Sequence, residues 1–506
     1  MRPAAIFSNN MVLQRHKPVR IFGTYSGSTR TIAVRIPELC VSAEAICRNG
    51  RLEAVLPPME ACPDCTVEIV CGAVKKIFRN VAVGEVWLCG GQSNMEYELH
   101  NDKNGAAELK SAARENVRFF YTPKCAVIDE EHRRSFEASR WDMPSEENSR
   151  AWSAVGWYFA KELSRKLGVT VGLIGCNWGG TSASAWVKRE VLTRDERLRS
   201  YIDEYENAIS GKSDEKMLTE YEDYLTYHAA WEKRVEKAYA DDPDIKWDEV
   251  EKLCGKNRYP GPMGISSPMR PCGLHETMAD FVCPYTLAGV LWYQGESDDH
   301  RADVYDVLLS SLIGEWRTEW QDECLPFLIV QLPMFRYRDD PDSKKWAVVR
   351  EAQMKVFRTV RNTGLAVCLD CGEFNNIHPT DKSQVGHRLY LQALSEVYGL
   401  ADRSGTLPPV FRDFTASGNR AVLRFGNCSG FEARGSLNGF EAAGTDGEFL
   451  PAEAEANGDE IVLTAGISPI TAVRYKWTNY AEVELYGTNG LPVPPFTSEI
   501  QPKADA

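Results

Sequence analysis

The chain has 506 residues, a formal net charge of −14 at pH 7, 43% hydrophobic and 26% charged residues. This length exceeds what one hydrophobic core usually holds, and the composition is that of a folded globular protein, so we expect two or three domains. The negative charge, with lysines and arginines scattered along the chain, argues against a nucleic-acid partner. The longest apolar stretches, residues 171–176 and 327–332 among them, fall far short of the ~18 residues of a membrane span. We therefore expect no membrane partner, and no pattern indicates an oligomeric state.

The N-terminus and the cysteines bear on the cellular compartment. Residues 1–8 lack the basic and apolar regions of a secretory signal, so we expect a cytoplasmic protein, or a secreted or periplasmic one if a signal has been removed. The 15 cysteines are an odd number, and Cys89, Cys176, Cys283 and Cys368 lie inside apolar runs. That placement is typical of reduced, buried thiols rather than of disulfides.

Residues 1–80 contain short β-type runs, at 18–23 and 31–36, separated by glycine, asparagine and proline. They predict an N-terminal β-sandwich or jelly-roll domain. From residue 81 to 402 the apolar pattern alternates between strand and helix. A helical face runs from Val155 to Leu167 and ends at Gly168, and a second runs from Val304 to Trp316. Strands are expected at 81–88, 169–176, 287–293, 327–332 and 364–369.

Strands that alternate with helices predict an α/β domain, with a mostly parallel sheet flanked by helices. Ligands of such domains collect at the carboxyl ends of the strands. Residues 188–256 interrupt this pattern with dense charge and aromatic residues at helical spacing, which predicts a helical insertion or lid. Residues 421–425 and 460–464 return to β patterning, so we expect a C-terminal β domain over 403–506.

Ser93 is the candidate nucleophile. It lies in the segment Cys-Gly-Gly-Gln-Ser-Asn-Met-Glu-Tyr-Glu at residues 89–98, directly after the apolar stretch 81–88. A serine just past a strand and beside glycines is lifted out of the sheet with backbone N–H groups exposed, which is the geometry that a nucleophilic serine needs. Because glycines beside a serine also occur in ordinary turns, the assignment needs support from the rest of the chain.

His378 is the candidate general base among the eight histidines. It lies in a turn-rich loop, and Pro379 restrains it to extended backbone. An ordinary loop histidine would have the same pattern. His132 lies in the charged stretch 129–134 and His228 lies in the charged insertion, where a solvated surface is the simpler interpretation.

Two further strand ends carry hydrogen-bond donors suited to an oxyanion. The turn at Gly179 and Gly180 exposes backbone N–H groups without side-chain obstruction. Gln294 follows another strand, and its side-chain amide either donates to an oxyanion or braces the loop.

Two Cys-x-x-Cys pairs, at residues 62–65 and 368–371, raise the question of a zinc site. They lie about 300 residues apart, whereas structural zinc pairs normally share one compact module. We expect no metal.

Four of these segments resemble, in chain order, the blocks of the sialate O-acetylesterase family, which belongs to the SGNH-hydrolase-like carbohydrate esterases. They are Gly-Gln-Ser-Asn-Met at 91–95, Trp-Gly-Gly-Thr at 178–181 with Trp186, Trp-Tyr-Gln-Gly-Glu-Ser-Asp at 292–298, and Ile-His-Pro at 377–379. Residues 11–15, 350–353 and 472–477 are similar to further segments of that family, so nearly the whole chain is covered.

The resemblance implies a flavodoxin-like α/β core and a serine esterase that removes acetyl groups from sugar hydroxyls without cofactor or metal. Ser93 would be the nucleophile and His378 the base, with the N–H of Ser93, the Gly179 and Gly180 turn and Gln294 forming the oxyanion hole. The substrate would be 9-O-acetyl sialic acid or, alternatively, acetylated xylan or another plant glycan. A non-catalytic sugar-binding protein, with its 13 tryptophans as stacking platforms, is the alternative of another class.

The chain departs from the family pattern before the histidine. Related esterases place an aspartate two or three residues earlier to orient the ring, whereas this chain has Asn375 and Asn376. The orienting group is therefore expected to be Asn375, a backbone carbonyl, or the carboxylate of Asp370 or Glu373.

Substrate binding adds three candidates. A sialate carboxylate calls for a cation, for which Arg350 and Arg388 are candidates. Glu296, two residues after Gln294, is the third.

Overall fold

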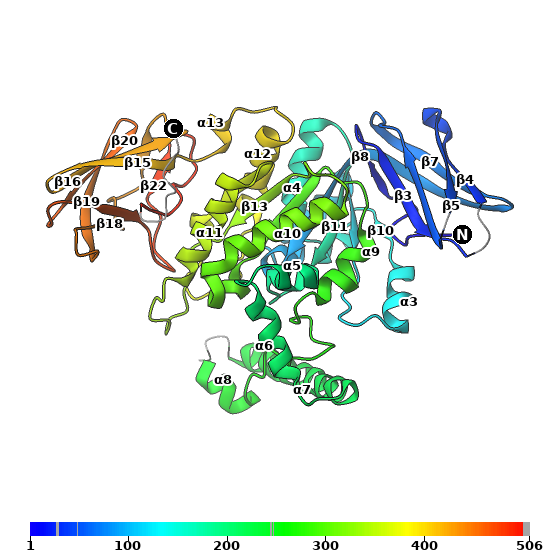
Figure 1. Cartoon of the computed structure of the whole chain (residues 1–506), viewed down its shortest axis with the longest axis horizontal. Coiled ribbons are helices and arrows are strands. Elements are labelled where there is room, and N and C mark those ends of the chain that lie inside the picture. Colours follow the sequence, from blue (N-terminus) through cyan, green and yellow to red (C-terminus); the bar gives the residue numbers. More distant parts are fainter. Residues whose placement is uncertain (27–29, 48, 243–244, 246, 499–506) are drawn as a thin grey trace. The chain divides into compact units, whose positions relative to one another are not determined.

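The structure is a computed structural model that describes residues 1–26, 30–47, 49–242, 245 and 247–498 (Figure 1). The chain forms two compact units. Unit 1 comprises Met1–Thr122, Phe136–Ala183 and Val282–Ala506, and unit 2 comprises Pro123–Ser135 and Ser184–Phe281. Both predicted domain limits, 80/81 and 402/403, lie inside unit 1, and the three-domain division stays a prediction.

The N-terminal part of unit 1 is built of short strands, as the β-type runs predicted. In β6 buried and exposed residues alternate, so one face of the strand is apolar and the other is solvated. The first eight strands are β1 (Arg2–Pro3), β2 (Val12–Gln14), β3 (Val19–Thr24), β4 (Arg30–Ile36), β5 (Val41–Cys47), β6 (Arg51–Leu56), β7 (Cys62–Cys71) and β8 (Val74–Gly91).

Strand β8 joins this part to the central sheet. Its first half pairs antiparallel with β7, and its second half, fully buried from Val81 onward, continues into the centre of the molecule. The predicted limit at 80/81 therefore falls within one continuous strand. The central strands are β9 (Val117–Tyr121), β10 (Trp141–Asp142), β11 (Val171–Asn177), β12 (Gly289–Tyr293), β13 (Phe327–Gln331) and β14 (Thr363–Val367).

The central sheet has the order β10-β9-β11-β8-β12-β13-β14. All neighbours from β9 to β14 are parallel, whereas β10 is antiparallel to β9. Because the N-terminal strands join through β8, the sheet has 11 strands and is mixed, so the prediction of a mostly parallel sheet holds only in part. Strands β11, β12, β13 and β14 are buried along their whole length, as expected for strands covered on both faces.

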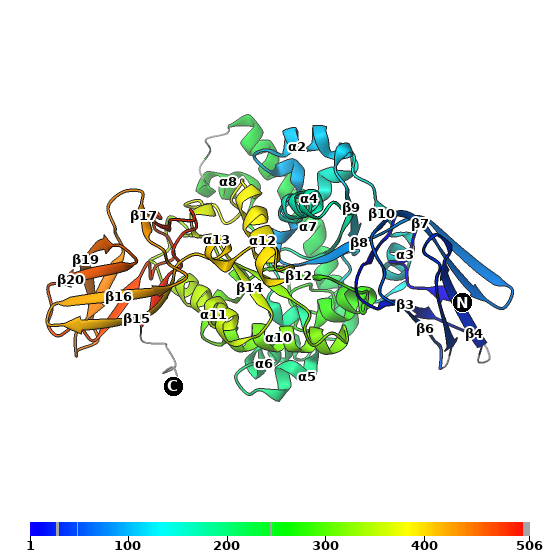
Figure 2. The same cartoon turned by 90° about the horizontal axis from the view of Figure 1, so that it is seen from above.

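The helices that cover this sheet have the predicted amphipathic faces. Figure 2 shows the strands between α4 and α12 on one side and α10 and α11 on the other. Helix α4 begins after Ser153, whose side chain accepts from Gly156 N, and ends at Gly168, which has a left-handed φ of 67°. The helices of unit 1 are α1 (Ser93–Glu96), α2 (Gly105–Ser111), α4 (Ala154–Leu167), α10 (Tyr305–Glu319), α11 (Lys345–Thr359), α12 (Ser383–Glu396) and α13 (Arg403–Thr406).

Unit 2 contains the predicted helical insertion. In it Trp231 and Cys254 pack around the fully buried Val250. His132 was predicted to be solvated, but its side chain is only 1% exposed, and its Nε2 lies 2.7 Å from Thr277 O. That prediction is wrong. The helices in and bordering this unit are α3 (Glu130–Ala138), α5 (Arg189–Arg194), α6 (Arg199–Ile209), α7 (Asp214–Asp241), α8 (Trp247–Cys254) and α9 (Asp280–Val282).

The C-terminal part of unit 1 is β-rich. A seven-stranded sheet has the order β15-β16-β20-β19-β18-β21-β23, and β17 pairs with β22. Its core includes Phe440 and Phe496, together with Phe411, which stacks on Phe496 at 4.1 Å between ring centroids. The strands are β15 (Val410–Ser417), β16 (Arg420–Gly426), β17 (Phe431–Ala433), β18 (Phe440–Ala443), β19 (Phe449–Asn457), β20 (Glu460–Ala465), β21 (Ala472–Tyr475), β22 (Leu485–Gly487) and β23 (Phe496–Thr497). Across the described residues, no helix is long and apolar enough to span a bilayer.

Candidate active site

The candidate site lies where three parallel strands end together. Gly91, the last residue of β8, is in register with Asn177 of β11 and with Tyr293 of β12. The strand order reverses at β8, because β9 and β11 lie on one side of it and β12, β13 and β14 on the other. Ligands of open α/β sheets bind at such a switch point. Ser93 follows two residues later, as the first residue of α1.

The loops after these strands are tied to one another by backbone hydrogen bonds. Gln92 N donates to Tyr293 O at 3.1 Å, and Trp178 N donates to Gly91 O at 3.1 Å. Gly91 has a φ of 129°, and a Cβ there would lie 2.1 Å from Tyr293 O. Only glycine permits this close approach, because any side chain would collide with backbone and adopt a strained φ. The glycine before the serine thus fixes where α1 begins.

Ser93 and His378 are in contact. His378 Nε2 lies 2.8 Å from Ser93 Oγ, and both residues are half-buried. Burial lowers the pKa of His378, and the positive charge of Lys382 lowers it further against the opposing effect of Glu96. The ring therefore favours its neutral form, which is the form that accepts a proton from a hydroxyl.

The loop that carries His378 is braced by its own side chains. His378 N donates to Asn376 Oδ1 at 3.1 Å, and Asn376 Nδ2 donates to Glu373 Oε2 at 2.8 Å. Glu373 Oε1 accepts from Thr380 N at 2.7 Å, which closes the loop at its base. Burial raises the pKa of Glu373, but the hydrogen bonds from Thr380 and Asn376 outweigh it and the net shift is downward, so the carboxylate is held ionised.

None of the predicted orienting groups contacts the imidazole. Asp370 is paired with Arg388, with Nη2 and Oδ2 2.8 Å apart. Asn375 accepts from Arg338 N at 3.0 Å, and Glu373 acts on the loop rather than on the ring. The described part of the chain gives His378 Nδ1 no hydrogen-bond partner.

The glycine turn after β11 lies against the serine, as predicted. A Cβ at Gly179 would be 3.2 Å from Ser93 Cβ. Gly179 N, however, donates to Glu96 Oε2 at 2.6 Å, so in this structure its N–H already has an acceptor. Gly180 has a φ of 74°, which turns the chain out of the strand direction.

Gln294 is a brace in this structure, which departs from the predicted role as an oxyanion donor. It is completely buried, and its Nε2 donates to Asp298 Oδ2 at 2.7 Å and lies 3.2 Å from both Thr181 O and Gln92 Oε1. An amide has only two N–H groups, so these acceptors use all of its donor capacity. The side chain holds the loops after β8, β11 and β12 together.

The predicted substrate-binding role of Arg350 is wrong. Arg350 is 0% exposed, and its guanidinium donates to four carbonyl oxygens, those of Leu332, Pro333, Thr478 and Asn479. No N–H group is directed at solvent where a substrate carboxylate would approach.

The other two substrate-binding candidates are also engaged inside the protein. Arg388 is 5% exposed and forms an ion pair with Asp370. Glu296 is 7% exposed, and its Oε1 accepts from Asn94 Nδ2 at 2.7 Å rather than facing an open site. Burial raises the pKa of Glu296, against the hydrogen bond from Asn94 and the charge of Lys382.

Comparison with known proteins identifies the family. A model of the family described as carbohydrate esterase, sialic acid-specific acetylesterase, matches residues 83–219 and 274–395, just over half of the chain. Both matched segments contain residues of the site, Ser93 in the first and His378 in the second.

The chain belongs to this family. It is therefore a carbohydrate esterase, an enzyme that hydrolyses carboxylic esters, and the resemblance seen in the sequence blocks is confirmed. The sialate O-acetylesterase of Mus musculus is 27% identical, over 99% of this chain and 94% of the relative, and that of Homo sapiens is 26% identical, over 99% and 92%. The crystal structure of a carbohydrate acetylesterase from Xanthomonas citri superposes with a TM-score of 0.77 at 28% identity, covering 99% of this chain and 100% of that one.

Three residues of this esterase's site were not foreseen. Asn94 is 0% exposed, Lys382 is 1% exposed with its Nζ 2.6 Å from Asn94 Oδ1, and Glu96 holds Gly179. Asn94 and Glu96 lie one and three residues after the candidate nucleophile Ser93, so their position in the sequence is a signal for a role in the site. Lys382 has no such signal, because a lysine is almost always exposed.

The two Cys-x-x-Cys pairs lie on different elements. Cys62 and Cys65 are on β7, whereas Cys368 and Cys371 follow β14, where Cys371 ends a short 3-10 helix (Leu369–Cys371). The expectation of no metal and no cofactor stays a prediction.

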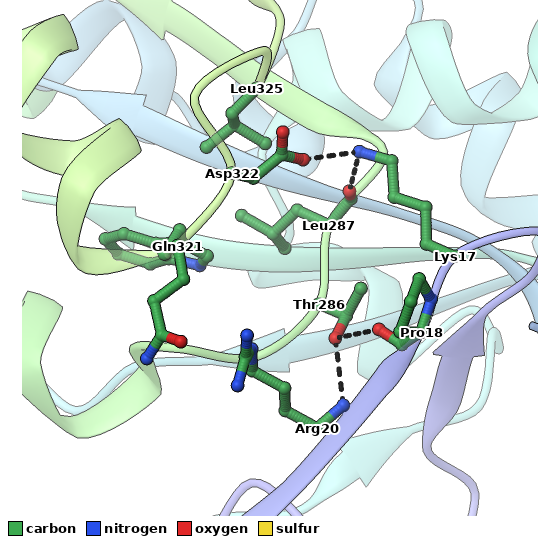
Figure 3. A pocket seen from close by; sticks show the side chains of 9 residues that line it. Lys17, Pro18, Arg20, Thr286, Leu287, Gln321, Asp322 and Leu325 are labelled. Atoms are coloured by element: carbon green, nitrogen blue, oxygen red, sulfur yellow. Dashed lines mark hydrogen bonds and ion pairs between the residues drawn. The ribbon is translucent and has the colours of Figure 1, made fainter. Parts of the chain in front are cut away.

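A cavity of about 310 Å³ lies apart from this site, lined by Lys17 and Arg20 from the N-terminal part and by Asp322 (Figure 3). Lys17 Nζ donates to Asp322 Oδ2 at 2.8 Å and to Leu287 O at 2.9 Å. These contacts stabilise the position of the N-terminal strands, and the cavity has no serine or histidine in its lining.

Proposed function

We propose that this esterase removes acetyl groups from sugar hydroxyls, with Ser93 as the nucleophile and His378 as the general base. The observation that carries the proposal is the 2.8 Å contact between Ser93 Oγ and His378 Nε2 at the carboxyl end of β8. A hydroxyl bonded to a neutral imidazole is the arrangement of an activated serine nucleophile. The acetylesterases named among the relatives support acetyl as the acyl group.

The order of the core strands supports an SGNH-type, flavodoxin-like core. Strands β11, β8, β12, β13 and β14 lie side by side. Numbered along the chain among themselves, they give the order 2-1-3-4-5 of the flavodoxin-like fold. The additional strand β9 extends the sheet beyond β11.

In the proposed reaction His378 Nε2 takes the proton of Ser93 while Oγ bonds to the acetyl carbonyl carbon and the carbonyl electrons move to oxygen. The intermediate collapses by breaking the bond to the sugar oxygen, which receives the proton from His378 and leaves as an alcohol. A water, deprotonated by His378, then attacks the acetyl-enzyme. The second tetrahedral intermediate collapses by breaking its bond to Ser93 Oγ. This releases acetate, and His378 returns the proton to Ser93.

The oxyanion needs donors close to Ser93 Oγ. The N–H of Ser93 is the first of α1 and has no acceptor inside the helix, which supports it as one donor. The N–H of Gly180, in the turn beside Ser93, is the second. Gly179 N–H contributes only after Glu96 releases it, and Gln294 contributes by bracing the loops rather than by donating.

The names of the mammalian relatives favour an O-acetylated sialic acid as the substrate, and we propose the 9-O-acetyl form. One observation favours the alternative, an acetylated neutral glycan such as xylan. Arg350 and Arg388, the two cations considered for a sialate carboxylate, are both buried, and each guanidinium is hydrogen-bonded inside the protein. A pocket for a neutral sugar needs neither.

Acetate release separates these possibilities. Purified protein is incubated with 9-O-acetylated sialic acid and with acetylated xylan, beside the Ser93→Ala variant. We expect turnover of at least one sugar ester and a loss of about a thousandfold or more in the variant. If wild type releases no acetate from any acetylated sugar or from p-nitrophenyl acetate, the protein is the non-catalytic sugar-binding alternative. Full activity of Ser93→Ala would remove Ser93 as the nucleophile.

A further inference from the structure

A bridge of three buried polar side chains lies behind the catalytic pair. Asn94 Nδ2 donates to Glu296 Oε1 at 2.7 Å, and Lys382 Nζ donates to Asn94 Oδ1 at 2.6 Å. Asn94, Lys382 and Glu296 are 0%, 1% and 7% exposed. Buried charges are costly unless they are paired, so a lysine and a glutamate in this position call for an explanation.

The same amide reaches the loop of the base. Asn94 Nδ2 also donates to Ile377 O at 3.0 Å, and Ile377 is the residue before His378. Asn94 itself directly follows the nucleophile Ser93. A single side chain therefore fixes the main chain next to the serine to the main chain next to the histidine.

We propose that Lys382, Asn94 and Glu296 form a positioning bridge that holds His378 against Ser93 in place of a triad carboxylate. The proposal rests on the proposed function, since it concerns the same pair of residues. All hydrogen-bonding atoms of the Asn94 amide are used: Oδ1 accepts from Lys382, and the two N–H groups donate to Glu296 and Ile377. With no acceptor for Nδ1 in the described part of the chain, the position of the ring depends on these main-chain contacts.

The position of Lys382 is fixed at both ends. Its backbone N donates to Asp102 Oδ2 at 2.8 Å, and its ammonium lies 4.7 Å from the centre of the Tyr97 ring. Burial lowers the pKa of Lys382 to about 8, against the opposing charge of Glu296, so the ammonium is still the main form at neutral pH.

The charge of Lys382 acts on His378. The groups that act on the imidazole are Lys382, which lowers its pKa, and Glu96, which raises it. The groups that act on the ammonium are carboxylates and a thiol, namely Glu296, Cys371, Asp102 and Glu373. Loss of the ammonium should therefore raise the pKa of His378. Because catalysis needs the neutral ring, the acid limb of the pH profile should then move to higher pH.

The test measures kcat/KM of the full chain on p-nitrophenyl acetate as a function of pH. Lys382→Met removes the cation, and Lys382→Met/Glu296→Gln removes the whole charge pair, so no unpaired charge stays buried. We expect the acid limb to move to higher pH in both variants. The matched control is Lys476→Met, a lysine that is 2% exposed in the C-terminal part and paired with Glu484, and it should leave the acid limb unchanged.

The isosteric variant Asn94→Asp tests the geometric half of the proposal. It keeps an acceptor for Lys382 but loses the N–H that Ile377 O accepts, so His378 is no longer held. We expect kcat to fall about a hundredfold with little change in KM, since a small misplacement of a reacting group has an effect of that size. The bridge would be overturned if the acid limb of the Lys382 variants stayed where it is in wild type, or if Asn94→Asp kept the wild-type kcat. An inactive Ser93→Ala variant would still support Ser93 as the nucleophile in either case.

Discussion

Replacing Arg350 by methionine separates a structural role from substrate binding. The guanidinium donates to the carbonyl oxygens of Leu332, Pro333, Thr478 and Asn479 at 2.8–2.9 Å. Burial lowers the pKa of Arg350 to about 9, which reflects the cost of keeping this cation away from water. Methionine fills a similar volume but donates no hydrogen bond.

The expected loss of stability follows from these four contacts. A buried acceptor left without a donor costs about 1–3 kcal/mol, so four of them cost at least about 4 kcal/mol. The substitution also removes the desolvation penalty of the guanidinium, which offsets part of that loss. We expect Arg350→Met to lower the free energy of unfolding by about 3 kcal/mol and to leave KM nearly unchanged for the molecules that stay folded.

Urea unfolding followed by tryptophan fluorescence, together with steady-state kinetics at 25 °C, measures both quantities. Arg424→Met is the matched control. Arg424 is 42% exposed and pairs with Asp413, and exposed ion pairs contribute at most about 1 kcal/mol. An Arg350→Met variant that unfolds at the wild-type urea concentration but has a much higher KM for 9-O-acetyl sialic acid would refute the structural role.

Three other substitutions have definite expected outcomes. Glu96→Gln removes the negative charge that raises the pKa of His378, so the acid limb of kcat/KM should move to lower pH, and a shift in the opposite direction would contradict the geometry. Gln294→Ala should lower the melting temperature and kcat together, whereas an oxyanion donor would lower kcat alone, by about a hundredfold or more. Gly91→Ala puts a Cβ 2.1 Å from a carbonyl oxygen and should prevent folding, as judged by near-UV circular dichroism. Its control, Gly314→Ala in α10, meets nothing within 4 Å and should stabilise the helix by about 1 kcal/mol.

The contact between Ser93 and His378, the proposed nucleophile and base, was predictable because each residue is marked by its immediate neighbours. Gly91 and the preceding apolar strand indicated a serine at a strand end, and Pro379 indicated a constrained histidine loop. Parallel strands bring their carboxyl ends to one edge of the sheet, so two such loops are expected to meet. Their contact at 2.8 Å agrees with that expectation.

The roles of Gln294 and Arg350 could not be predicted in the same way. Each belongs to a residue type that often binds substrate or an oxyanion. Gln294 follows β12, whereas Arg350 lies inside α11. Whether its N–H groups are free depends on acceptors from distant segments, such as Thr181 for Gln294 and Asn479 for Arg350. Burial of each side chain against these distant segments decides whether its N–H groups are free, and the sequence near each residue does not indicate that burial.

The sequence by itself determined the family, the alternation of strands and helices and the positions of Ser93 and His378, because these depend on local patterns of apolar residues, glycine and proline. Only the tertiary structure decided how the histidine is held. Asn375 and Asn376 stand where a carboxylate was expected, and Asn94 and Lys382, which lie 288 residues apart, take part in holding the loop instead. A hydrogen bond depends on distance in space and on the exclusion of water, and folding alone brings such distant residues together.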